Sequence, residues 1–271
     1  MILRIPNDRR LLVELFVCSN LAFLVLDVAI AHAVNRFASG AEWIPVGFAA
    51  LGAAALVPGI VRSWRAAARP GTAGTVVGWC GVAVGIAGLV FHLRSQFFAA
   101  TTLHNLVYSA PFAAPLSFAG LGLLLLANRM IPDESPEWPE WVVFLALAGF
   151  AGNFVLSLTD HAQNGFFNRL EWIPVVASAF AVGFLLVALQ RPLTAGFVRA
   201  CWYVLAAQVA TGVAGFGLHV WTDLHGPTHH LTLDFLYGAP AFAPMLFADL
   251  AVLAGIGLAS LPLARETTGD G

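Results

Sequence analysis

The stretch HAVNRFASGAEWIPV, residues 32–46, recurs as HAQNGFFNRLEWIPV, residues 161–175. The two copies lie 129 residues apart, so His32 and Glu42 of the first copy correspond to His161 and Glu171 of the second. A match of polar and aromatic residues at one fixed offset indicates an internal duplication. The duplicated polar residues are where we look first for chemistry.

Two further stretches repeat. YSAPFAAPLSFA, residues 108–119, matches YGAPAFAPMLFA, residues 237–248, at the same offset, and GIAGLVFH, residues 85–92, matches GVAGFGLH, residues 212–219. We therefore predict a first repeat over residues 1–130, a cytoplasmic linker over 131–140 and a second repeat over 141–271.

Composition predicts an all-α integral membrane protein. Hydrophobic residues make up 59% of the chain and charged residues only 10%. An apolar run of about 20 residues spans a bilayer, and lipid admits only helices or closed barrels. No strand-like alternation persists. Eight spans are predicted, four in each repeat, at Leu11–His32, Trp43–Trp64, Thr72–Phe97, Leu103–Met130, Trp138–His161, Trp172–Gln190, Leu193–Trp221 and Thr232–Leu261.

Four spans per repeat give both repeats the same orientation, with a pseudo-twofold axis along the membrane normal. The chain has no lysine, so arginine alone indicates its orientation. Three arginines fall on one side, at Arg36, Arg94 and Arg169, and ten on the other, at Arg4, Arg9, Arg10, Arg62, Arg65, Arg69, Arg129, Arg191, Arg199 and Arg265. The positive-inside rule then predicts a bacterial-type inner membrane protein with both termini in the cytoplasm.

The histidines gather at the outer ends of the predicted spans. In a four-helix bundle, the first and third helices run parallel, so His32 should face His92 and His161 should face His219. Two facing imidazoles are the arrangement that ligates haem iron or begins a metal site. Gly88 and Gly215 lie one turn before a histidine, where a missing side chain leaves either a slot for a porphyrin or a helix contact.

A non-haem centre of copper, iron or zinc is the alternative cofactor, because histidine and carboxylate ligands suit these metals. Glu42 and Glu171 are candidate ligands, although an acidic residue before Trp-Ile-Pro also fits a helix start. The remaining candidates are His104 in the first repeat and His225, His229, His230 and Asp234 in the second.

Each of the two proline pairs, Pro111 with Pro115 and Pro240 with Pro244, is expected to kink a helix and favours a cavity near the outer leaflet. Tyr108 and Tyr237 stand one turn outward, where they either hydrogen-bond a cofactor or anchor the helix at the interface.

Two functions remain open. The first is a membrane redox protein, with a membrane oxidoreductase as its enzymatic form, that exchanges electrons with a quinone or a periplasmic redox partner. The second is a metal-ion transporter or metal-handling protein that uses the same histidines and receives its metal from a carrier protein. Polar residues are scarce in the inner halves of the spans apart from Glu14, Gln208 and Asp249, which favours a fixed site over a pathway. The net charge of −2 and the lack of a basic patch give no indication of a nucleic-acid partner.

Overall fold

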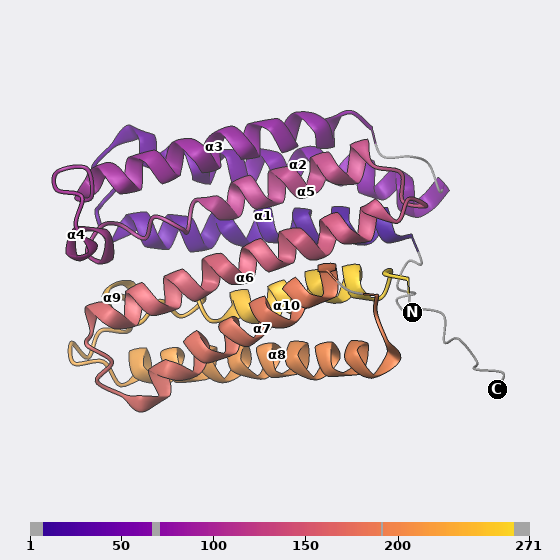
Figure 1. Ribbon diagram of the computed structural model, residues 1–271. Coiled ribbons are helices and arrows are strands. Elements are labelled where there is room, and N and C mark those ends of the chain that lie inside the picture. Colours follow the sequence, from indigo (N-terminus) through magenta and orange to yellow (C-terminus); the bar gives the residue numbers. More distant parts are fainter. Residues whose placement is uncertain (1–7, 67–70, 191, 263–271) are drawn as a thin grey trace.

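The computed structural model describes residues 8–66, 71–190 and 192–262, and this part of the chain is 78% helical without strands (Figure 1). The terminal regions and four of the predicted inner arginines, Arg4, Arg69, Arg191 and Arg265, lie outside the described residues. The elements are α1 Arg9–Ala33, η1 Gly40–Glu42, α2 Trp43–Ala66, α3 Ala73–Ser95, α4 Leu103–Val107, α5 Leu116–Met130, α6 Glu137–Gln163, η2 Arg169–Glu171, α7 Trp172–Gln190, α8 Ala195–Leu224, α9 Leu231–Tyr237 and α10 Met245–Leu258.

Six of the described helices, α1, α2, α3, α6, α7 and α8, are long and apolar enough to cross a membrane. They coincide within a few residues with six of the predicted spans. Much of the surface of these helices is apolar, as the exposed Leu51, Trp79 and Phe180 illustrate. Such a surface suits lipid contact, and the fold is consistent with a multi-pass helical membrane protein.

The other two predicted spans are not continuous helices, which corrects the sequence prediction. Residues 103–130 form the short helix α4 and the 15-residue helix α5, separated at Tyr108–Pro115. Residues 231–258 are divided in the same way into α9 and the 14-residue α10. The prolines cause the break, because each lacks the amide hydrogen that would continue the helix. At 1.5 Å per residue, α5 extends about 22 Å, less than the ~30 Å of a bilayer core.

Helix pairing is the same in the two halves of the chain. Helix α1 packs on α2 and α3 packs on α5, just as α6 packs on α7 and α8 packs on α10. The halves meet where α6 contacts α5 and where α1 contacts α10. Helix α5 ends at Met130 and α6 begins at Glu137, so the non-helical connection between the halves is shorter than the predicted linker 131–140.

Glycines allow α3 and α5 to approach closely. A Cβ atom added to Gly81 would lie 3.0 Å from the backbone oxygen of Phe118, and one added to Gly78 would lie 3.0 Å from that of Gly122. Small residues at such positions are typical of helix contacts in membranes.

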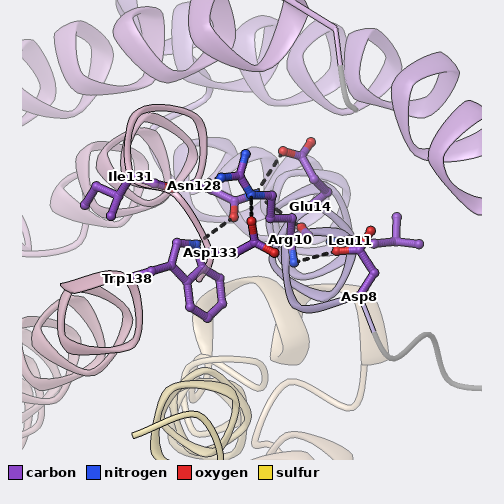
Figure 2. Close-up of polar contacts among 8 residues, drawn as sticks. All are labelled: Asp8, Arg10, Leu11, Glu14, Asn128, Ile131, Asp133 and Trp138. Carbon is purple, nitrogen blue, oxygen red and sulfur yellow. Dashed lines mark hydrogen bonds and ion pairs between the residues drawn. The ribbon is translucent and has the colours of Figure 1, made fainter. Parts of the chain in front are cut away.

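A polar network joins α1, α5 and α6 at the end of the bundle where α1 begins (Figure 2). Arg129 contacts the buried carboxylate of Glu14 at 2.9 Å. Asn128 donates to Glu14 and accepts a hydrogen bond from the indole of Trp138. Arg10 adds an ion pair to Asp133 at 2.8 Å. The network fixes the start of α1 against the connection between the two halves.

Candidate functional site

The predicted histidines His32, His92, His161 and His219 lie near the ends of α1, α3, α6 and α8. These four helices finish at the same end of the bundle, close to α4 and α9 (Figure 1). We call this end the histidine end. The described outer arginines, Arg36, Arg94 and Arg169, also lie there, whereas Arg9, Arg10, Arg62, Arg65, Arg129 and Arg199 lie at the opposite end.

The structure brings His32 and His92 together. Their ring centres are 6.3 Å apart and the ring planes are nearly perpendicular, at 83°. In the second half, His161 and His219 are close enough to interact electrostatically. In the first half, the parallel course of α1 and α3 therefore brings the two imidazoles together, as the sequence predicts.

His92 is oriented by the broken helix. Pro115 has no amide hydrogen to donate to the carbonyl oxygen of Pro111, four residues earlier. That oxygen instead accepts from the amide of Ala114 at 3.1 Å and contacts Nδ1 of His92 at 2.9 Å. Because a carbonyl oxygen only accepts, Nδ1 carries the hydrogen, and in the neutral ring Nε2 keeps a free lone pair.

His219 has the same environment in the second half. Its Nδ1 lies 2.9 Å from the carbonyl oxygen of Pro240, which also accepts from the amide of Ala243 at 3.1 Å. Histidine ligands of metals commonly donate their other ring N–H to a carbonyl or carboxylate in this way. The prolines were predicted as helix breakers, but their role as acceptors was missed. The signal in the sequence was a second proline four residues after each acceptor, which leaves the acceptor's carbonyl oxygen without its helical amide partner.

His32 and His161 each lie beside a carboxylate whose Oε2 is buried and has no hydrogen-bond partner within the described residues. Nδ1 of His32 lies 3.5 Å from Oε2 of Glu42, and Nδ1 of His161 lies 3.6 Å from Oε2 of Glu171. Oε1 of Glu42 accepts from the amide of Ser39 at 3.3 Å as part of a capping box at the start of η1. Glu42 therefore serves the helix start and also faces the histidine.

A tight turn places these carboxylates beside the histidines. Phe37 and Phe166 adopt left-handed backbone angles, with φ of 49° and 50°. Their rings stack on Trp43 and Trp172, with ring centres 3.9 Å and 4.1 Å apart. The repeated phenylalanine and tryptophan thus fold the chain back on itself after α1 and α6.

Gly88 and Gly215, the glycines of the predicted slot, each lie beside a proline. A Cβ atom added to Gly88 would lie 2.7 Å from Cβ of Pro115, and one added to Gly215 would lie 2.8 Å from Cβ of Pro244. Both glycines therefore fit against the prolines of the broken helices. This contact favours the helix-packing alternative, and the porphyrin slot stays a prediction.

The other predicted ligands lie around the pairs. His104 is exposed and packs on Tyr108 with ring centres 4.5 Å apart, and His225 packs on Trp221. His229 and His230 are exposed, and Asp234 is buried. Within the described ranges, no three His, Cys, Asp or Glu side chains are close enough to hold one metal ion. The predicted metal sites that combine these residues with the paired histidines stay predictions.

Tyr108 and Tyr237 lie at the surface, with 45% and 55% of their areas exposed. These positions suit interfacial anchors better than cofactor contacts.

Comparison of the chain with family models, curated proteins and solved structures gives no match.

Proposed function

We propose that the protein is a multi-pass membrane redox protein whose histidine pairs hold a metal centre near one face of the bilayer. The geometry of His32 and His92 carries the proposal. An imidazole nitrogen lies about 2 Å from a bound metal ion, so two imidazoles on opposite sides of one ion have ring centres roughly 6 Å apart. The separation of 6.3 Å matches that arrangement.

The orientation of the rings supports ligation through Nε2. Nδ1 of each pair member faces an oxygen, from a proline carbonyl or from a glutamate. This leaves Nε2 as the nitrogen available to a metal ion. A haem b with two axial histidines uses two such ligands. A copper, iron or zinc ion would need further ligands, for which Glu42 and Glu171 are the nearest carboxylates.

We further propose that the chain is a tandem duplication with eight membrane crossings. The fourth and eighth crossings would each combine a short helix, the proline segment and the helix that follows it. The same local contacts recur in both halves, which supports this proposal. The distribution of arginines supports cytoplasmic termini in a bacterial inner membrane, with the histidine end on the periplasmic side.

Transport of a metal ion along the bundle has less support. The polar side chains of the inner halves are engaged in contacts between helices. Glu14 pairs with Arg129, the amide of Gln208 donates to the carbonyl oxygen of Ala177, and Asp249 accepts from Asn20 at 2.8 Å. These contacts favour a fixed centre that exchanges electrons with a quinone or a periplasmic redox protein.

Cofactor retention in single variants tests the proposal. We expect the purified wild-type protein to carry haem or a transition metal, and His92→Ala and His219→Ala each to lose a measurable part of it. Absorption spectra of the oxidised and reduced protein, together with metal analysis, measure this loss.

His104→Ala is the matched control, because this exposed histidine at the same end lies outside the pairs. It should retain the full cofactor content. Because His92 also contacts the broken helix, its replacement can lower stability alone, so a thermal unfolding curve accompanies each variant. A His92→Ala protein that keeps all of its cofactor would contradict the proposal.

A further inference from the structure

Two buried aspartates face the loop between α8 and α9. Asp223 lies in the last turn of α8 and Asp234 lies in α9, and their exposed fractions are 1% and 5%. The two carboxylates are close enough to repel each other electrostatically. Two buried like charges are costly unless a cation or proton compensates them.

One carboxylate oxygen is left without a partner. Oδ1 of Asp223 accepts from the amide of Ala239 at 2.9 Å, and Oδ1 of Asp234 accepts from the amide of Thr228 at 3.2 Å. Oδ2 of Asp223 is buried and has no hydrogen-bond partner within the described residues. A buried carboxylate oxygen without a partner is expensive, and so points to a ligand at this place.

Two glycines bring the backbone against these carboxylates. A Cβ atom on Gly238 would overlap both Oδ1 of Asp223 and the carbonyl oxygen of Asp234. One on Gly226 would overlap the carboxylate of Asp234. Oδ1 of Asp223 and the backbone oxygen of Asp234 therefore both lie beside Gly238, while the carboxylate of Asp234 lies beside Gly226 in the same loop.

The first half of the chain has neutral groups in the same place. The amide of Ala110, the counterpart of Ala239, donates to the hydroxyl of Ser95 at 3.0 Å. The counterpart of Asp234 is Asn105. The first half thus forms the corresponding contacts with neutral groups, and only the second half has an acidic pair there.

We propose that Asp223 and Asp234 bind a hard divalent cation, of which Ca²⁺ is the best fit. Calcium takes six to eight oxygen ligands in flexible geometry, whereas Mg²⁺ requires a near-ideal octahedron. Carboxylate and backbone oxygens of a loop suit Ca²⁺. The site adjoins the second histidine pair, because Asp223 is close enough to His219 to interact with it electrostatically. Its cation would hold α8 against the segment that orients His219.

Calcium binding to the full-length protein tests the site. After treatment with a chelator, we expect Ca²⁺ to raise the melting temperature of the detergent-purified protein and to bind at about one equivalent per chain, as measured by calorimetry. Asp223→Asn and Asp234→Asn should each weaken this binding by at least roughly tenfold. Glu140→Gln, an exposed acidic residue at the opposite end, should leave it unchanged.

The proposal would be overturned by a wild-type protein that binds neither Ca²⁺ nor Mg²⁺, with Asp223→Asn more stable than wild type in chelator. That result would mean that the two carboxylates share a proton. Calcium binding that survives both aspartate substitutions, or a preference for Zn²⁺, would overturn it as well. His92→Ala should retain Ca²⁺, so failure of this site is distinguishable from failure of the redox proposal.

Discussion

At the scale of single residues, the clearest feature is the way in which each paired histidine is held. The rings of His92 and His219 are fixed by carbonyl oxygens that a proline four residues later leaves without their usual partner. This contact also has a purely structural value, because it satisfies an acceptor in the broken helix. The two roles are compatible, since Nδ1 serves the helix and Nε2 stays available.

The ion pair of Glu14 and Arg129 is the most buried charged contact described. The side chains are 1% and 11% exposed and 2.9 Å apart. Its counterparts in the second half, 129 residues later, are Val143 and Leu258, both buried. The same corner of the fold is therefore built once from charges and once from apolar side chains.

This comparison predicts the effect of substitution at the ion pair. Glu14→Gln should lower the free energy of unfolding by about 3–5 kcal/mol, because it leaves the buried guanidinium of Arg129 uncompensated. The double variant Glu14→Val with Arg129→Leu, which copies the second half, should recover most of that loss. Unfolding in mixed detergent micelles measures both, with Glu140→Gln as the exposed control. A double variant as unstable as the single one would contradict this explanation.

At the scale of elements, the contact of α3 with the start of α5 determines the position of the broken helix. This contact requires the glycines of α3, because Pro115 and Ala119 fill the space beside Gly88 and Gly85. The corresponding contact of α8 with α10 uses Gly215 and Gly212.

Gly88→Ala separates the packing role from a cofactor role. The added methyl group would lie 2.7 Å from Cβ of Pro115, and overpacking of this kind costs about 1–3 kcal/mol. Gly120→Ala is the matched control, because no atom lies within 4 Å of the added methyl group. Thermal unfolding should show a loss of stability for Gly88→Ala and no loss for Gly120→Ala. Loss of cofactor at unchanged stability in Gly88→Ala would instead favour the porphyrin slot.

The sequence predicted the elements better than it predicted their interruptions. Apolar runs in the sequence predicted the six long helices. The parallel direction of the first and third helices predicted that His32 would face His92. The apolar run over residues 103–130 gave no indication that a helix ends inside it, because the residues on both sides of Pro111 and Pro115 are equally apolar. The partners of Glu14 and His92 were missed because they depend on tertiary contacts. The sequence separation is 115 for Glu14 and Arg129 and 19 for His92 and Pro111.

At the scale of the whole molecule, the two halves share one plan and differ at opposite ends. The first half carries a buried ion pair at the end where α1 begins, and the second carries a buried acidic pair at the histidine end. The histidine pairs and the turns that hold them are common to both. The proposed centre would therefore have different surroundings in the two halves.

The most direct test of the proposed centre is X-ray absorption spectroscopy at the edge of the metal that copurifies with the protein. We predict two imidazole nitrogens per metal ion at about 2.0–2.1 Å, lost when His32, His92, His161 and His219 are all replaced by alanine. A wild-type protein with no more metal than that variant, or a bound metal without imidazole ligands, would contradict the account.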